Sequence, residues 1–316
     1  MNNLKKLGLT ALAGSLMATS AYAADYTIAG GASMDIKNRD HLSNGRSIGM
    51  GNQLNFSASG ETDGGLTVST AFELDQGALG GAGPFDNHSV SVGSDSMGTI
   101  TVAGHGGTNA GSALDATAAG DLWDNTLGGS VGMSSGASGN NLVTYALPAL
   151  MDDVAIAVSY SSEAAASNAN AEGSTAIGLT FTGVEGLTVK LGRADDNTAQ
   201  TTDATQTTMS ASYAVGSFTV GYSNSDYDHT TSTSDQEVTS YAVSYTVSDS
   251  ISISYGVEDF ELDGAAADAE VEGISASYTS GGMTITAKQI EATDNDYTAG
   301  ADNDTRYWNL GASFAF

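Results

Sequence analysis

The chain has 316 residues, a formal net charge of -28 and no cysteine. Charged residues make up only 15% of it, with 37 Asp and Glu against 9 Lys and Arg. A chain this acidic repels the phosphates of nucleic acids, so a nucleic-acid partner is not expected. The absence of cysteine excludes a disulfide framework, and 40 glycines with only 2 prolines exclude a proline-rich linker protein.

The first 23 residues are organised as a secretory signal peptide. Lys5 and Lys6 precede a short apolar stretch over residues 7–18, and Ala21-Tyr22-Ala23 forms an A-x-A cleavage motif. We therefore expect cleavage after Ala23 and a mature domain over residues 24–316, with the net charge changing from -28 to -30. No later stretch reaches about 18 uninterrupted apolar residues, so no transmembrane helix is predicted.

From Asp25 onward, apolar and small polar residues alternate with a period of two, which is typical of β-strands with two different faces. In residues 241–247, for example, Tyr and Val take one face and Ala, Ser and Thr take the other. Seven short turns alternate with eight long, polar and mostly acidic loops, which predicts sixteen strands. The long loops cover residues 35–48, 76–87, 105–139, 161–174, 194–205, 224–236, 261–270 and 292–304.

The regular alternation of short and long connections predicts an all-β fold, a 16-stranded antiparallel transmembrane β-barrel. A β-sandwich would mix long and short connections at both ends, and a solenoid would show a fixed sequence repeat. Several aromatic residues are expected on the outward face near strand ends, as in interfacial girdles. They are Tyr145, Tyr160, Phe181, Tyr213, Tyr245, Tyr255, Tyr278 and Trp308.

The last eleven residues, RYWNLGASFAF, alternate aromatic and apolar residues with small and polar ones. In water, such an exposed edge would promote aggregation. We expect its apolar face, with Trp308, Phe314 and Phe316, to point into lipid, and the last strand to pair with the first so that the barrel has no free edge.

Three stretches resemble the general bacterial porins, of the alphaproteobacterial type. They are NQLNFSASGETDGGLTVSTAFELDQG (52–77), HSVSVGSDSMGTITVAGHG (88–106), and NNLVTYALP (140–148) followed by DDVAIAVSYSSE (152–163). This resemblance implies a Gram-negative outer-membrane protein with short periplasmic turns, long extracellular loops and a homotrimeric assembly. It also implies that the third long loop, about residues 105–139, folds into the barrel and narrows it.

The resemblance also suggests partners and an assembly signal. Phe316, with Phe314 and Trp308 on the same strand, resembles the C-terminal signal read by the barrel-assembly machinery. Outer-membrane lipid, lipopolysaccharide and small hydrophilic solutes are the other expected partners. No cofactor is expected to be required.

The third long loop supplies the candidate constriction acids Asp115, Asp121 and Asp124, and its Leu122-Trp123 pair could pin it to the inner wall. Family members usually place arginines and lysines opposite this loop. Here His105 stands after the fifth strand where an Arg is common, and Asn140 and Asn141 occupy another such place.

Alternation places other charged side chains on the inward face. Lys37, Arg39, Lys190 and Lys288 are expected inside, as are the acids Glu73 and Glu258, whereas Arg46, Arg193 and Arg306 lie at strand tops where the pattern is unreliable. We therefore expect a pore constriction formed by Asp115, Asp121, Asp124, His105, Glu73, Lys37, Arg39, Lys190 and Lys288. Its balance is negative, which predicts selectivity for cations.

The long loops carry acids that could supply oxygens to calcium or magnesium, chiefly Asp294, Asp296, Asp302 and Asp304. No EF-hand spacing occurs in them. The alternative, solvated loops without a bound ion, therefore stays open.

The sequence contains no convincing enzyme motif. Residues 128–132 fit G-x-S-x-G by letters but lie in a Gly- and Ser-rich loop instead of between a strand and a helix, and the four histidines show no metal-ligand spacing. We expect no enzyme but a water-filled channel for passive diffusion of small hydrophilic solutes and ions. Two alternatives remain: a solute-specific channel, for example for sugars, and a plugged structural or adhesive barrel.

Overall fold

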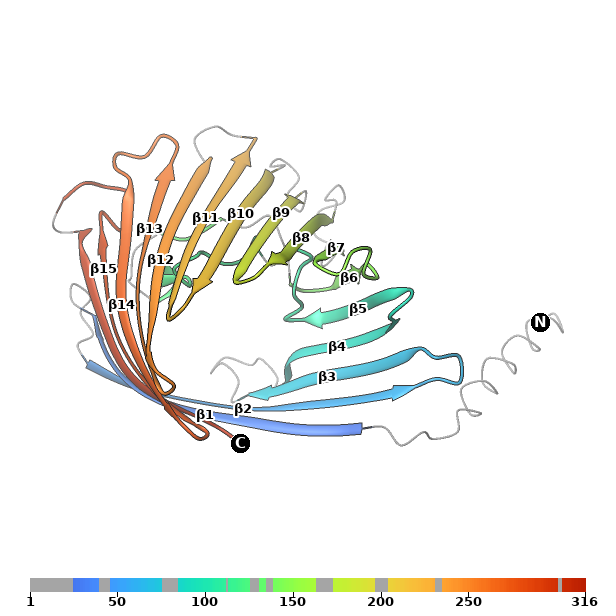
Figure 1. Cartoon of the computed structure of the whole chain (residues 1–316). Helices are drawn as coiled ribbons and strands as arrows, with labels where there is room; N and C mark the ends of the chain where they lie inside the picture. Colours follow the sequence, from blue (N-terminus) through green and yellow to red (C-terminus); the bar gives the residue numbers. More distant parts are fainter. Residues whose placement is uncertain are drawn as a thin grey trace.

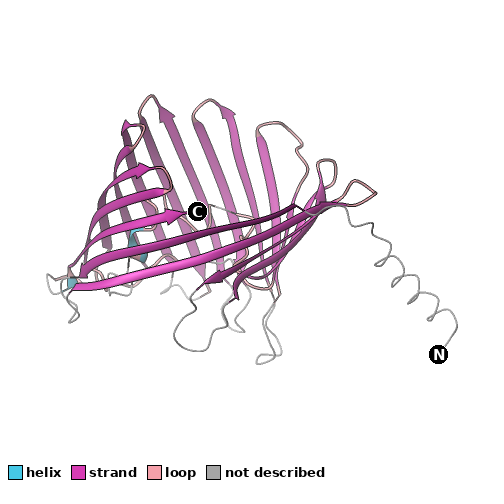
Figure 2. Ribbon diagram, turned by 90° about the horizontal axis from the view of Figure 1, so that it is seen from below, coloured by secondary structure: helices cyan, strands magenta, loops and turns pink. Residues whose placement is uncertain are grey.

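Sixteen antiparallel strands form one closed barrel, which confirms the predicted fold class (Figure 1). The computed structural model describes residues 25–39, 46–75, 85–111, 113–125, 131–134, 139–162, 173–196, 204–230, 235–300 and 303–316. The expected signal peptide lies outside the described residues. Each strand pairs with its sequence neighbours, and β1 pairs with β16 to close the wall, which Figure 2 shows as a continuous tilted sheet.

The strands differ in length around the barrel. The first half consists of β1 (Asp25–Arg39), β2 (Arg46–Glu61), β3 (Thr67–Asp75), β4 (Phe85–Ser94), β5 (Gly98–His105), β6 (Leu142–Ala146), β7 (Val154–Ser161) and β8 (Ser174–Val184). The second half consists of β9 (Leu187–Asp196), β10 (Ala204–Val215), β11 (Phe218–His229), β12 (Gln236–Ser248), β13 (Ile251–Leu262), β14 (Ala269–Ser280), β15 (Met283–Thr293) and β16 (Thr305–Ala315).

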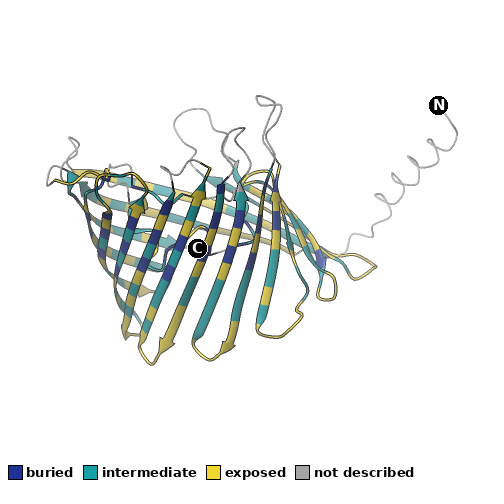
Figure 3. Ribbon diagram, turned by 90° about the horizontal axis from the view of Figure 1, so that it is seen from above, coloured by how far each residue is buried: buried dark blue, intermediate teal, exposed yellow. Residues whose placement is uncertain are grey.

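Apolar side chains point outward along most of the wall, the reverse of a soluble protein. On β12, for example, Tyr241, Val243 and Tyr245 are exposed, whereas Ser240, just before them on the opposite face, is fully buried. Figure 3 shows this change from buried to exposed along successive strands. The outward aromatics also meet across strands: the ring centroids of Phe218 and Tyr245 lie 4.7 Å apart. Such a wall is suited to a lipid surround.

Short turns close one end of the barrel and long loops leave the other. The link between β10 and β11 has two residues, as does the link between β14 and β15. Each begins with a glycine at φ 59, Gly216 and Gly281, a conformation that tight hairpins require and that other residues rarely adopt. Among the described residues, no helix is both long and apolar enough to cross a bilayer.

The seam between β1 and β16 continues to the last residue. Phe314 pairs with Ala32 on β1, and Trp308 pairs with Asn38. Phe316 exchanges two backbone hydrogen bonds with Gly30: Gly30 N donates to Phe316 O at 2.7 Å, and Phe316 N donates to Gly30 O at 3.0 Å. The apolar end of the chain is therefore paired within the sheet, as the sequence predicts.

Candidate functional site

The third long loop, residues 106–141 and called L3 here, joins β5 to β6, and the structure describes its residues 106–111, 113–125, 131–134 and 139–141. Its two ends are tied together, because Gly107 N donates to Gly139 O at 2.6 Å and Gly106 N donates to the Asn140 side-chain oxygen at 3.1 Å. Asn141, at φ 50, then turns the chain into β6 and donates its N–H to Gly104 O. This closed base fixes where the loop enters the lumen.

The first limb of L3, residues 106–111 and 113–125, follows the inner wall around the barrel. Its backbone groups are held by inward-facing polar side chains from β7, β10, β11 and β12, at distances of 2.7–3.0 Å. The four wall residues are Ser159 on β7, Gln206 on β10, Ser223 on β11 and Ser240 on β12. Because otherwise unpaired backbone groups of the loop find partners there, the contact is specific and water is not needed to satisfy them.

Small residues in the wall let the loop approach closely. A Cβ added at Gly256 would lie 2.6 Å from Ala119 Cβ, and one at Gly192 would lie 2.7 Å from Leu114 Cγ. A glycine within a strand weakens the strand but admits another backbone or side chain at close range. These glycines therefore form a seat for L3.

Glu258 on β13 is the anchor of the L3 turn. Its side chain is fully buried and accepts hydrogen bonds from the Thr117 hydroxyl, from Leu122 N at 2.9 Å and from Trp123 N at 3.0 Å. The short 3₁₀ turn η1 (Leu122–Asp124) begins at this point. Because the carboxylate satisfies three donors at once, it fixes both the height and the orientation of the turn.

Asp121 stabilises the same turn from within the loop. It adopts φ 55, its carboxylate accepts the Thr117 N–H at 2.9 Å, and its own N–H donates to the Thr117 hydroxyl. Burial raises the pKa of Asp121 above the ordinary aspartate value, and the nearby Asp124 raises it further, although the hydrogen bonds from Thr117 oppose this. Asp121 therefore stabilises the L3 turn through its two hydrogen bonds with Thr117.

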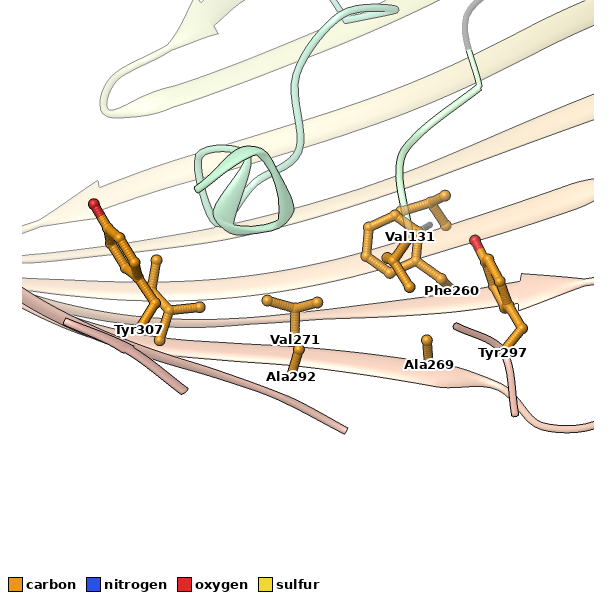
Figure 4. Close-up of a cluster of buried hydrophobic side chains, with 9 residues drawn as sticks. Val131, Phe260, Ala269, Val271, Ala292, Tyr297 and Tyr307 are labelled. Carbon is orange, nitrogen blue, oxygen red and sulfur yellow. The ribbon is translucent and has the colours of Figure 1, made fainter. Parts of the chain in front are cut away.

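The second limb of L3, residues 131–134 and 139–141, packs through Val131 on an apolar sector of the inner wall (Figure 4). The alternation in the sequence predicts polar side chains there. Val131 contributes to a buried cluster with inward side chains of β12–β16, and Trp123 and Met133 pack against it. The wall and loop residues of this cluster are Val238, Phe260, Ala269, Val271, Ile290, Ala292, Tyr297 and Tyr307. This part of the barrel interior is a hydrophobic core, not a water-lined surface.

Gln236 joins this limb to the last long loop, residues 294–304. Its side-chain nitrogen donates to Gly132 O at 2.8 Å and to the Tyr297 hydroxyl at 2.9 Å, and its oxygen accepts the Ser134 N–H at 2.7 Å. Burial raises the pKa of Tyr297. Wall, L3 and last loop are thus connected through one side chain.

The other predicted acids of L3 are exposed. Asp115 accepts a hydrogen bond from the Asn109 amide, and Asp124 lies at the end of η1. Next to Asp124, Asn125 accepts a hydrogen bond from the Lys288 ammonium, so this lysine contacts the loop directly. Lys288 also lies within electrostatic range of Lys37 and Asp124.

Most of the predicted basic residues gather on β15, β16 and β1. Lys37 and Lys288 flank Asn309 in one register row, and Arg39 stands opposite Tyr307 in the next row of that face. Lys37 Nζ lies 3.4 Å from Asp35 Oδ2. Lys190 lies apart from this group, inward on β9 between Thr180 and Ser210.

Glu73 on β3 and His105 at the end of β5 line one cavity near the base of the loop. The three arginines at the strand tops point outward instead. Arg46 stands opposite Asn38 and Arg193 opposite Ile177, and Arg306 pairs with Glu291 at 3.3 Å. They are therefore separate from the charges of the lumen.

The acids of the last loop serve as turn acceptors. Asp294 accepts the Gly300 N–H at 2.9 Å, and Asp304 accepts the Asp294 N–H at 3.3 Å. The main-chain oxygen of Asp296 accepts a hydrogen bond from the Thr298 hydroxyl. Asp302 lies outside the described residues. Within the described part of the chain, no group of three or more His, Cys, Asp or Glu side chains is arranged to hold a metal ion.

Sequence reasoning missed the residues that hold the loop. Glu258 was expected to face inward, but nothing in the alternation indicated that it would anchor L3. Ser240, Gln206 and Gln236 resemble ordinary inward polar residues. A usable signal is the size of Glu258 and Gln236 among mostly small inward neighbours, since a long polar side chain at a buried position needs partners.

A closed sixteen-stranded barrel with an apolar exterior, entered by a loop that carries charge into its interior, defines a transmembrane β-barrel channel. The family model described as Gram-negative porin matches residues 8–298, and the chain belongs to this family of outer-membrane channel proteins. No curated protein matches the chain in a sequence comparison.

Solved porin structures share the fold at low sequence identity. The anion-selective porin from Comamonas acidovorans is 15% identical with a TM-score of 0.71, and the match covers 93% of this chain and all of that one. Outer-membrane expressed OmpT of Vibrio cholerae is 17% identical with a TM-score of 0.67, covering 94% and 99% of the two chains. A triple mutant of Rhodopseudomonas blastica porin is 13% identical with a TM-score of 0.68, covering 92% and 100%.

Proposed function

We propose that the chain forms a water-filled channel for passive diffusion of small hydrophilic solutes and ions, with a preference for cations. The observation that carries the diffusion function is the course of L3. Its described first limb is hydrogen bonded to β7, β10, β11 and β12 along the inner wall, and a loop held in this way narrows a barrel without crossing it.

The proposed cation preference rests on charge. In this proposal, Asp115, Asp121 and Asp124 of L3 face the lumen, and a pore lined by acids concentrates cations and repels anions. One of the opposing lysines, Lys37, has an acidic neighbour that offsets its charge, because its Nζ lies 3.4 Å from Asp35 Oδ2. The similar Comamonas acidovorans porin is named anion-selective, so the fold alone does not set the sign of selectivity.

The zero-current potential across a tenfold KCl gradient at low salt tests this preference. We expect wild type to favour potassium, and a triple Asp→Asn variant at positions 115, 121 and 124 to lose much of that preference. Charge acts over roughly a Debye length, about 10 Å at 0.1 M salt, so the effect should fade at high salt. An anion-selective wild type would refute the proposal. An unchanged potassium preference in the variant would show that other residues carry the selecting charges.

The same recordings separate the alternatives. Steady ohmic conductance supports diffusion, whereas saturable block by one solute supports a solute-specific channel, and absence of conductance supports a plugged barrel. We further propose that the protein assembles as a homotrimer among outer-membrane lipid and lipopolysaccharide, with Phe316 read by the barrel-assembly machinery. Native mass spectrometry of the detergent-extracted protein measures the subunit number.

A further inference from the structure

A cavity of about 520 Å³ opens in the inner wall beside the base of L3. It is lined by residues of β2–β7 and by the first residues of the loop. Small-molecule sites typically have volumes of about 300–1,000 Å³, with mostly apolar linings and a few polar groups that orient the ligand. This cavity has the size of such a site, and it lies at the level where the loop begins.

The cavity has a small apolar floor and a polar rim. Ala71, Ala103, Ala157 and Leu142 supply the floor. The rim carries carboxamide, hydroxyl, imidazole and carboxylate groups, and the residues that matter here are Asn55, Asn87, Asn109, Thr101, His105 and Glu73. An apolar floor with amides around it accommodates the carbon skeleton of a hydroxylated ring while bonding its edges.

Two irregularities in the sheet border this cavity. Between β3 and β4, Phe72 pairs with His88 and Leu74 with Phe85, so Asp86 and Asn87 of β4 lie opposite Glu73. Between β4 and β5, His88 pairs with His105 and Ser89 with Ala103, so Gly104 is an extra residue directly before His105. Bulges change the direction of individual side chains and are over-represented at barrel rims and next to active sites. Glu73 and His105, one beside each irregularity, both line the cavity.

Glu73 is the one carboxylate among the residues that line the cavity, and no lysine or arginine lines it. The carboxylate accepts one long hydrogen bond from the Asn87 amide at 3.4 Å, which leaves acceptor capacity on both oxygens. The His105 ring nitrogen Nδ1 lies 3.1 Å from Asp86 Oδ1, so this neighbour is turned toward another acid. The site therefore favours a positively charged group.

Resting on the proposed channel function, we propose that this cavity is a binding subsite for small hydroxylated solutes that carry an ammonium group, such as amino sugars. The ammonium group binds Glu73, the hydroxyl groups bind the surrounding amides and Thr101, and the ring carbons lie on the alanine floor. A solute that pauses here partly occludes the path beside L3.

Three probes of matched size test the proposal in single-channel recordings: D-glucosamine, D-glucose and D-glucuronate. We expect D-glucosamine to produce transient, concentration-dependent block at concentrations about tenfold lower than D-glucose, because a hydrogen bond between an ammonium and a carboxylate is stronger than one between neutral groups. D-glucuronate should block more weakly than D-glucose. Equal block by D-glucosamine and D-glucose in wild type would overturn the proposal.

Two variants locate the site. Glu73→Gln should abolish the difference between D-glucosamine and D-glucose, and Ala71→Leu should abolish D-glucosamine block by filling the floor without changing any charge. Glu261→Gln, which removes a carboxylate exposed on the outer face of β13, should retain the difference. Loss of the difference in Glu261→Gln, or block that survives Ala71→Leu, would contradict the subsite. Failure of the channel function itself would be distinct, because no ion conductance would then appear.

Discussion

The ring of Phe316 occupies the space that a side chain at Gly30 would need. A Cβ added at Gly30 would lie 2.5 Å from Phe316 Cε2 and 2.9 Å from Leu54 Cδ2. The two residues also exchange both of their backbone hydrogen bonds across the seam. Gly30 is therefore the residue of β1 on which the Phe316 ring packs and with which the Phe316 backbone pairs.

Replacing Gly30 by valine should impair barrel closure. The added methyl groups force the Phe316 ring off the outer wall, and overpacking of this kind costs about 1–3 kcal/mol. We expect a lower amount of protein in the outer membrane, measured by immunoblot of membrane fractions, with unchanged conductance of the channels that do insert. Gly60→Val is the matched control, because a Cβ at Gly60 has no neighbour within 4 Å. Equal levels of the two variants would refute the role of Gly30.

Removing one acceptor oxygen from Glu258 should loosen L3. Glu258→Gln keeps the shape but turns an amide donor toward the loop N–H groups, which leaves at least one of them unpaired at a cost of about 1–3 kcal/mol. We expect larger open-channel current fluctuations in bilayer recordings. Glu261→Gln is the control, since Glu261 lies on the same strand but is exposed on the outer face. Quiet, wild-type currents from Glu258→Gln would show that the loop does not depend on this anchor.

Alanine substitutions at Gly256 and Gly221, two wall glycines beside L3, should lower the conductance to different extents. At Gly256 the new methyl group would lie 2.6 Å from Ala119 Cβ, so residues 118–120 must move into the lumen, whereas at Gly221 it would lie 3.4 Å from Ala118 Cβ. We expect Gly256→Ala to lower single-channel conductance and Gly221→Ala to leave it near wild type. Identical conductances would mean that the wall does not set the position of the loop.

The raised pKa of Asp121 predicts a pH dependence of selectivity. Because burial favours its neutral form, Asp121 takes up a proton at a higher pH than an ordinary aspartate does. On acidification from neutral pH, the potassium preference should therefore begin to fall before the ordinary aspartate range is reached. The raised value also means that the folded state gains relative stability as the pH falls through this range and loses it as the pH rises.

The reversal potential measured from pH 7 to pH 4 checks this prediction, with Asp121→Asn as the comparison. In that variant the early part of the decline should be missing. A wild-type curve that coincides with the variant would show that Asp121 does not contribute charge to the pore.

Alternation in the sequence predicts the barrel well because strand faces follow a strict period of two. In the structure, Lys288 and Glu73 each line a cavity, and Trp308 is exposed. Alternation could not place a residue by height along the barrel, so it gave no indication that Glu258 meets the L3 turn while Lys190 stands apart from the other lysines. Height depends on register between strands, which loop lengths and bulges set.

The apolar sector inside the barrel was also beyond sequence reasoning. Phe260 and Val271 occupy inward positions, where the alternation predicts polar residues, and they are fully buried. Their partners, Val131 on L3 and Tyr297 on the last loop, are distant in sequence from both. A local pattern cannot reveal a core that only long-range contacts complete.

This apolar sector also makes L3 and the last strands depend on each other for burial. Val131 precedes β6 in the chain, but the cluster that buries it is built from β12–β16 and the loop that joins the last two strands. Val131 on L3 is therefore buried only where β12–β16 are in place. In turn, the inward apolar side chains of β13 and β14 are covered only where L3 packs on them. Because each covers the apolar surface of the other, this part of L3 and the inner face of β12–β16 complete one buried core only when both are present.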